Sequence, residues 1–193
     1  MSVTIRLAQN SDIPHIAELI PLSARKLQAT YYSSAQIEGA LGTVFAVDSQ
    51  LIIDGTYFVA EACGQIVGCG GWSQRNALFG GDRSLADSQD ILLDPTQEES
   101  ARIRAFFVHP DWSRRGIGTR IMQTCEDAAI QAGFKKIELV ATLAGEPLYT
   151  AFDYHAIPLC GQRFAIARFE IPLSNGIQLP VVRMKKNLKA LIL

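Results

Sequence analysis

One segment, residues 106–120, constrains the fold more than any other part of the chain. An apolar stretch ends at Val108, a proline and a short polar turn follow, and Gly116-Ile117-Gly118 opens a helical pattern. This order predicts a strand, a loop and the N-terminus of a helix, whose first backbone N–H groups have no partner within the helix. Because Gly116 and Gly118 lack a Cβ atom, a ligand can approach the backbone closely there.

The same segment carries local positive charge on Arg114, Arg115 and Arg120. Cationic side chains, unpaired N–H donors and the positive end of a helix dipole together favour a phosphate or pyrophosphate group. The whole chain has a net charge of -1 and a pI near 6.3, so this charge is a local feature. We therefore expect an anionic cofactor, and no nucleic-acid partner.

The composition is that of a compact protein, with 193 residues, 48% apolar and 19% charged. No domain boundary is visible, so residues 1–193 are expected to form a single domain. The four cysteines include no Cys-x-x-Cys pair, which favours buried thiols over a metal site. The chain shows no secretory signal and no apolar run that could span a bilayer, so we expect a cytoplasmic protein without a membrane partner.

The hydrophobic patterning predicts an alternation of helices and strands that is typical of a mixed α/β sheet. Pro21 is expected to break or kink the first helix, and the acidic stretch of about 73–100 reads as a long loop, either a lid or a disordered segment. In chain order we expect a strand at 3–7, helices starting near 13 and 34, strands at 56–62, 66–72 and 101–108, a helix at 116–132, a strand at 136–140, a helix at 146–152, and strands at 162–171 and 178–184.

Residues 113–118 resemble motif A of the GNAT superfamily of N-acetyltransferases, whose pattern is Gln/Arg-x-x-Gly-x-Gly/Ala. Ser113 stands where the family has Gln or Arg. The order of elements along almost the whole chain also resembles the GNAT fold, an α/β fold with a mixed sheet. A Rossmann unit is disfavoured, because Ile121 stands where its third glycine belongs.

The resemblance implies that acetyl-CoA is the acetyl donor and that no metal takes part. The loop would hold its pyrophosphate through backbone N–H groups, and the end of the preceding strand would pair with its pantetheine arm. The cofactor-binding residues implied are Phe106, Val108, Arg114, Arg115, Gly116, Ile117, Gly118 and Thr119.

A second stretch, Leu148 to Tyr154, resembles the family segment Phe-Tyr-x-x-x-Gly-Phe, with Asp153 in place of the glycine. The resemblance implies that Tyr149 is the general acid that protonates the departing thiolate. A structural tyrosine beside the cofactor is the alternative. The backbone N–H of Val108 is expected to polarise the thioester carbonyl.

The general base remains open at this point. Glu61, His109 and His155 are candidates, and a water relay to solvent is the alternative. Arg102 and Arg104 are expected to lie either on a solvated face or against an acidic substrate.

The function predicted is transfer of an acetyl group to a primary amine of a small molecule. Direct attack in a ternary complex is expected, because no cysteine is placed as an acyl carrier. Tyr31, Tyr32 and the acidic loop are the candidate contacts to the acceptor. The alternatives are a protein or peptide (lysine or N-terminal) acetyltransferase and a non-catalytic acyl-CoA sensor; a homodimer is possible.

Overall fold

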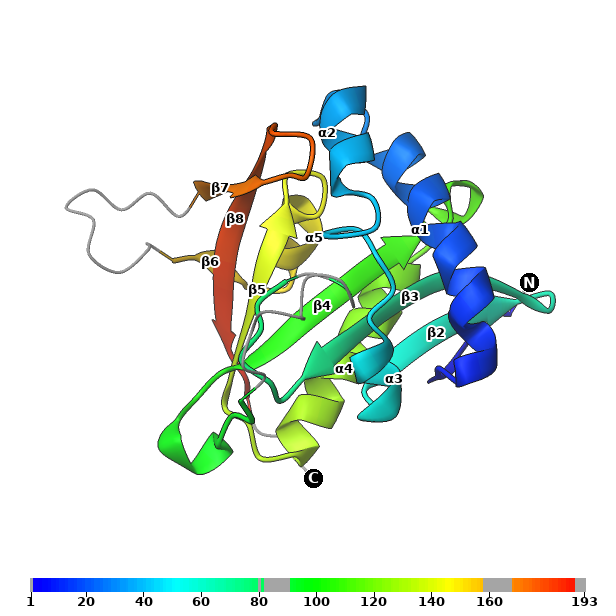
Figure 1. Cartoon of the computed structure of the whole chain (residues 1–193). Coiled ribbons are helices and arrows are strands. Elements are labelled where there is room, and N and C mark those ends of the chain that lie inside the picture. The colour runs from blue at the N-terminus through cyan, green and yellow to red at the C-terminus, as the bar shows by residue number, and fades with distance from the viewer. Residues whose placement is uncertain (1, 80, 82–90, 158–167, 190–193) are drawn as a thin grey trace.

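A computed structural model describes residues 2–79, 81, 91–157 and 168–189 of the chain. Its centre is one mixed sheet in the order β1-β2-β3-β4-β5-β8-β6, and β7 also pairs with β8 (Figure 1). Neighbouring strands are antiparallel except β4 and β5, which are parallel. The strands are β1 Thr4–Leu7, β2 Tyr57–Ala62, β3 Gln65–Ser73, β4 Ala101–Val108, β5 Lys136–Thr142, β6 His155–Ala156, β7 Arg168–Pro172 and β8 Gln178–Asn187.

Helices cover both faces of this sheet. One face packs against α4 in a buried cluster that includes Ile117, Ile121 and Met122. The opposite face packs against α1 and α2 in a second cluster that includes Ile16, Ile20 and Ile37. The α-helices are α1 Ile13–Leu27, α2 Ser34–Ala40, α3 Ser49–Ile53, α4 Ile117–Gln131 and α5 Glu146–Ala151. Within the described residues, short 3-10 turns cover Asn10–Asp12, Pro95–Gln97 and Pro110–Trp112.

The first helix runs through Pro21 and does not break there. Proline removes one backbone hydrogen bond from a helix interior, so this continuity requires compensation. The apolar positions of α1 provide it, because Ile16, Ile20 and Ala24 are fully buried against the sheet. Tertiary packing therefore outweighs the local cost of the proline.

The end of β4 carries a β-bulge, which positions everything that follows it. Gly71 pairs with Arg104 and Cys69 pairs with Phe107, so two residues of β4 oppose one of β3. Ala105 stands in this bulge with a φ of 56°, a left-handed conformation unusual for alanine. The parallel pairing of β4 with β5 covers Ala101–Ile103 alone, and beyond it the two strands diverge (Figure 1).

The predicted mixed α/β fold is confirmed, with two additions. The structure contains a helix, α3, and a two-residue strand, β6, that the hydrophobic pattern does not predict. Of the predicted strand 162–171, residues 168–171 lie in β7 and the others fall outside the described residues. The expectation of buried thiols holds for Cys69 and Cys125 but is wrong for Cys63, which sits exposed in the turn between β2 and β3; Cys160 is outside the described residues.

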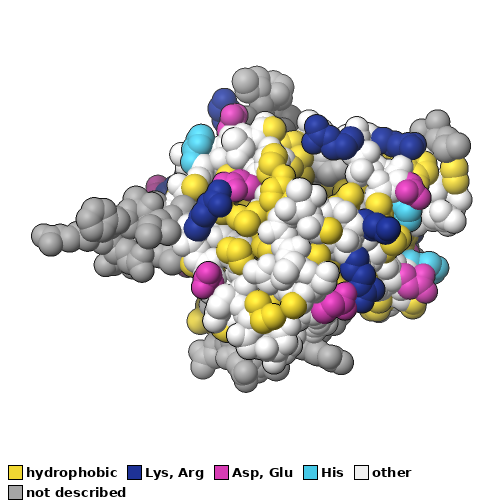
Figure 2. All heavy atoms as spheres, turned by 90° about the horizontal axis from the view of Figure 1, so that it is seen from above, with side chains coloured by type: hydrophobic (Ala, Val, Ile, Leu, Met, Phe, Trp, Pro, Cys, Tyr) yellow, Lys and Arg dark blue, Asp and Glu magenta, His cyan; other side chains and the backbone are white. Residues whose placement is uncertain are grey.

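The predicted long loop contains local order in its described parts. The 3-10 turn Pro95–Gln97 and a bridge between Arg75 and Leu92 lie within it. In the described parts of the chain, no helix combines the length and apolar character needed to cross a membrane. Basic and acidic side chains are interspersed on the face shown in Figure 2, so the described atoms of that face form no large patch of one charge.

Candidate functional site

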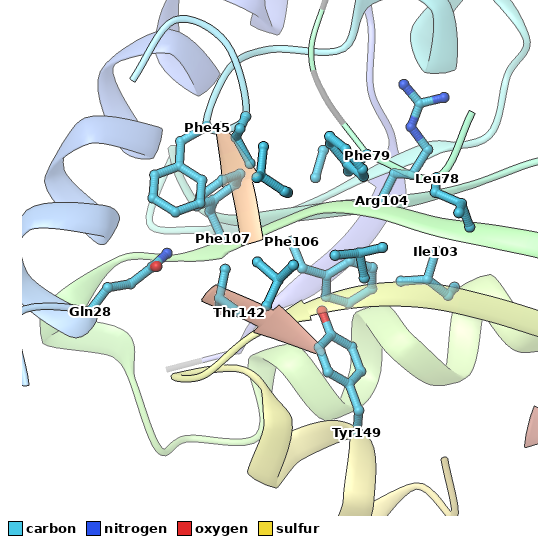
Figure 3. A pocket seen from close by; sticks show the side chains of 15 residues that line it. Gln28, Phe45, Leu78, Phe79, Ile103, Arg104, Phe106, Phe107, Thr142 and Tyr149 are labelled. Atoms are coloured by element: carbon cyan, nitrogen blue, oxygen red, sulfur yellow. The ribbon is translucent and has the colours of Figure 1, made fainter. Parts of the chain in front are cut away.

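A small cavity lies where β4 and β5 diverge. It has a volume of about 80 Å³. Its walls come from both buried clusters: Tyr149 and Ile103 belong to the α4 face, and Phe45 and Phe107 to the α1 face. Figure 3 shows Tyr149 rising from α5 with its hydroxyl directed into the space between the strands. Residues from both faces of the sheet therefore line the cavity.

Tyr149 is the polar side chain that reaches this cavity from the α4 face. It is 8% exposed, and its ring meets that of Phe106 edge to face with centroids 6.4 Å apart. Burial raises the pKa of Tyr149 above its ordinary value. The phenol consequently keeps its proton at neutral pH and remains a hydrogen-bond donor. The structure thus brings Tyr149 and Phe106, both predicted site residues, to one place.

The N-terminus of α4 offers backbone donors without a side-chain cap. Gly116 is the N-cap residue at a φ of 77°, and no side chain in the described part of the chain caps this helix. A Cβ atom on Gly116 would meet nothing within 4 Å, so the backbone faces open space. The amides of Ile117, Gly118 and Thr119 are the first of the helix and have no intrahelical acceptor. An anion fits these donors.

Gly118 has a different role from Gly116. A Cβ atom there would lie 3.2 Å from Cδ2 of Leu148 in α5. The glycine therefore lets the start of α4 approach the helix that carries Tyr149. The two glycines of the motif combine an open backbone with a close helix contact.

The three arginines near this helix are used differently. The Arg115 guanidinium lies 5.0 Å from the centroid of the Trp112 ring. Arg120 donates to the carbonyl oxygen of Val3 at 2.8 Å, so it ties α4 to the N-terminal strand. Arg114 has a φ of 61° and is exposed in the loop. Arg114 and Arg115 thus remain the cationic candidates for an anion.

The Val108 amide already has a partner in the structure. It donates to Oγ of Ser23 at 3.3 Å, across the interface between β4 and α1. Ser23 is buried, at 4% exposure. A ligand carbonyl could accept from this amide only by replacing the Ser23 hydroxyl. The bond to Ser23 is long for a hydrogen bond, which makes it the weaker partner to displace.

The candidate bases do not gather at the cavity. The Glu61 carboxylate accepts from Nε of Arg6 at 2.8 Å and is not among the described residues that line the cavity. His109 Nδ1 accepts from the Asp111 amide at 3.2 Å and caps the turn after β4. His155 is exposed in β6. The geometry therefore brings none of the three to Tyr149.

Two other expectations are corrected by burial. Arg104 is 4% exposed and its NH2 group lies 2.5 Å from Oδ2 of Asp48, while NH1 of Arg102 lies 3.6 Å from Oε2 of Glu138 in an ion pair. Neither arginine lies on a solvated face, because each is in a buried ion pair. Tyr32 is a structural clamp: its hydroxyl donates to Pro180 O at 2.7 Å and accepts from the Leu143 amide at 2.8 Å. Tyr31 is exposed.

Sequence reasoning missed two glycines that shape the site from β3. A Cβ atom on Gly70 would lie 2.6 Å from the ring of Phe106, and one on Gly68 would lie 2.7 Å from Cγ2 of Ile117. These residues let the Phe106 ring and helix α4 lie flat on the sheet. The sequence signal that could have revealed them is their spacing, because positions two apart in a strand lie on the same face of the sheet.

Metal binding has no support in the geometry of the described residues. No group of three or more His, Cys, Asp or Glu side chains that could hold a metal ion occurs in that part of the chain.

Comparison with known proteins identifies the class. The model of the acetyltransferase (GNAT) family matches residues 24–154. This match spans more than half of the sequence, so the chain belongs to the acetyltransferase (GNAT) family. A search of curated proteins finds no match. The predicted fold class, family and enzyme class are thereby confirmed.

Solved structures share the fold over nearly the whole chain. A GCN5-related N-acetyltransferase from Rhodopseudomonas palustris is 19% identical, has a TM-score of 0.68, and is matched over 97% of each chain. The PaiA N-acetyltransferase of Thermoplasma acidophilum, solved with coenzyme A, is 13% identical with a TM-score of 0.62 over 97% of this chain and 99% of that one. YncA of Salmonella typhimurium, a putative acetyltransferase solved with acetyl-CoA, is 14% identical with a TM-score of 0.59 over 100% and 98%.

Proposed function

We propose that this acetyltransferase moves the acetyl group of acetyl-CoA to a primary amine of a small molecule by direct attack in a ternary complex. The observation that carries the proposal is the cavity between β4 and β5. It lies between the diverging strands beside Tyr149, is lined from both faces of the sheet, and has the uncapped N-terminus of α4 on the same face as Tyr149. Donor and acceptor can then meet from opposite faces.

The donor side is the face that packs against α4. The backbone amides of Gly116, Gly118 and Thr119 would hold the pyrophosphate, and Arg114 and Arg115 would add positive charge. The diverging ends of β4, at Phe106 and Val108, leave backbone groups for the pantetheine arm. Two of the similar structures were solved with coenzyme A or acetyl-CoA, which supports this choice of donor.

Tyr149 would supply the proton that the chemistry requires. In acetyl transfer the amine nitrogen forms a bond to the carbonyl carbon while the carbon–sulfur bond breaks and the amine loses a proton. Tyr149 would donate its phenolic proton to the departing sulfur. Burial keeps it protonated, so this acid is available throughout the neutral range. The Val108 amide would polarise the carbonyl, in exchange for its bond to Ser23.

The base is assigned to water. Glu61 is held by Arg6, and the imidazole of His109 caps a turn, so each already has a partner of its own. A water relay from the acceptor to solvent requires neither side chain.

A panel assay tests the proposal. Purified protein and acetyl-CoA are mixed in separate reactions with a monoamine, a polyamine, an amino acid, an aminoglycoside and a lysine peptide. Release of free thiol gives the rate, and mass spectrometry identifies the acetylated product. We expect an acetylated small amine. Acetylation of the peptide alone would assign the protein-acetyltransferase alternative, and coenzyme A binding without any turnover would assign a sensor.

A pair of glycine variants tests the donor site. Gly116→Val places a branched side chain at a positive φ in the proposed cradle, and Gly55→Val does the same at a φ of 68° in a turn before β2. Both positions have a positive φ, so both variants suffer similar backbone strain. Both also face open space, so neither variant adds a steric clash. Calorimetric titration with coenzyme A should show at least about tenfold weaker binding for Gly116→Val alone. Equal affinities in the two variants would contradict the placement of the pyrophosphate.

A further inference from the structure

Gln28 places an unsatisfied polar atom on the wall of the cavity. The residue follows α1, is 7% exposed and lines the cavity together with Tyr149. Its Oε1 is buried and has no hydrogen-bond partner among the described residues. Figure 3 shows the amide directed toward the cavity from the α1 face. Buried polar atoms without partners are rare in native proteins, so such an atom requires an explanation.

The backbone of Gln28 does not supply that explanation, because its own bonds are complete. Its N–H donates to Ala24 O at 3.1 Å, and its carbonyl accepts from the amides of Tyr31 and Tyr32 at 2.9 and 3.0 Å. These bonds hold the connection between α1 and α2 whatever the side chain. The fold therefore needs the residue's backbone and gains nothing from its amide oxygen.

Most of the other described residues that line the cavity have apolar side chains, although polar groups also face it. Four phenylalanines contribute to it: Phe45, Phe79, Phe106 and Phe107. None of the described lining residues is Asp or Glu, and the one cationic side chain among them, Arg104, is in an ion pair with Asp48. A ligand that places a hydrogen-bond donor on Gln28 and an apolar body against these side chains fits them.

We infer that the acceptor is a primary amine on a compact apolar body, and that Oε1 of Gln28 accepts a hydrogen bond from its amine N–H. The inference rests on the proposed acetyl transfer. A neutral amine has two N–H bonds and one lone pair, so one N–H on Gln28 leaves the lone pair for the carbonyl carbon. A neutral amide oxygen suits this step, because a carboxylate there would favour the unreactive ammonium form.

A polyamine is a poorer fit than the acidic loop of about 73–100 suggests. The described acidic residues of that loop are engaged locally: Asp94 accepts from Thr96, Glu98 binds Lys136, and Glu99 accepts from the Asp94 amide. None of them lines the cavity. A second ammonium group would thus enter the cavity without a described counter-charge.

Substitution of Gln28 tests the contact. Gln28→Met keeps the length of the side chain and removes the acceptor oxygen. We expect kcat/KM for the amine to fall roughly 10- to 100-fold. KM for acetyl-CoA should not rise, and the melting temperature should not fall. A fall in melting temperature together with loss of both substrates would instead mean a structural role, and unchanged amine kinetics would overturn the contact.

Gln28→Glu serves as the matched variant, because it restores an oxygen at the same position. We expect it to keep KM for the amine near the wild-type value but to lower kcat at neutral pH, since its charge holds the ammonium form. Kinetics identical to those of Gln28→Met would contradict the inference.

A second comparison tests the apolar body, with phenethylamine and isoamylamine against spermidine as acceptors. Higher kcat/KM for the two apolar amines supports the inference. Turnover of spermidine alone overturns it and leaves the proposed acetyl transfer standing. Turnover of no amine, with coenzyme A still bound, overturns both.

Discussion

Replacement of Tyr149 by phenylalanine removes one oxygen from the buried ring and leaves its packing intact. The ring contacts, with centroids 6.4 Å from Phe106 and 6.0 Å from Tyr154, are those of the ring itself and persist in the variant. The fold should therefore change in stability by no more than about 1 kcal/mol. If the phenol protonates the leaving thiolate, kcat should fall about 10²- to 10⁴-fold. That loss corresponds to about 3–5 kcal/mol of transition-state stabilisation.

The assay separates an acid from a structural tyrosine by varying the leaving group. An acid matters most when the departing thiol is weakly acidic, so an activated aryl thioester should lose far less rate in Tyr149→Phe than acetyl-CoA does. Tyr154→Phe is the control, because it alters the neighbouring buried tyrosine and should leave this dependence unchanged. Because burial raises the pKa of Tyr149, the wild-type phenol stays protonated beyond pH 10, and no loss of kcat below that pH should come from its ionisation. Equal losses with both thioesters would refute the assignment.

Three further predictions concern the frame of the site. Gly70→Ala would place Cβ 2.6 Å from the Phe106 ring, so urea unfolding should show a loss of about 1–3 kcal/mol together with lower kcat/KM; unchanged activity would argue that Phe106 lies outside the site. Arg104→Met should destabilise the protein by about 3–5 kcal/mol because it leaves Asp48 charged at 0% exposure, and the double variant with Asp48→Asn should recover much of this loss; equal melting temperatures for the single and double variants would contradict the ion pair. Burial raises the pKa of Tyr32, Tyr57, Tyr149 and Tyr154. Above about pH 10 the unfolded chain therefore releases phenolic protons that the folded protein retains. The free energy of unfolding should consequently fall by up to about 1.4 kcal/mol per pH unit for each tyrosine. Tyrosinate absorbance in a Tyr31→Phe background, recorded with urea unfolding from pH 8 to 11, checks the last prediction, which would be wrong if all four ionised near pH 10 in the folded protein.

The elements around the Gly116-Ile117-Gly118 motif could be predicted because their signals are local. The apolar strand before it, the glycines within it and the helical period after it each lie within a few residues. The structure has β4, the start of α4 and the helix that carries Tyr149 where the hydrophobic pattern indicates. The hairpin of β2 and β3 follows for the same reason, from two apolar runs and a short turn.

Features that depend on contacts distant in sequence could not be predicted. Strand β6 has two residues and exists through its pairing with Met184 and Lys185 of β8. The continuity of α1 through Pro21 depends on burial against the sheet. Gln28 carries no sequence signal, because an exposed and a buried glutamine at a helix end look alike until the opposite wall of the cavity is known.

The bulge at Ala105 has a consequence for the insertion and deletion of residues in this chain. Arg104 and Ala105 both lie on the α1 side of the sheet, after which Phe106 returns to the α4 side and Phe107 to the α1 side. A deletion of one residue at this point would restore simple alternation and turn each later side chain of β4 over. The residues that now face α4 at the end of β4 would then face α1. The loop and its glycines would therefore start the helix from the opposite face of the sheet. We therefore expect β4 to tolerate substitution better than any change in its length, and length variation in natural or engineered relatives should fall outside residues 101–118.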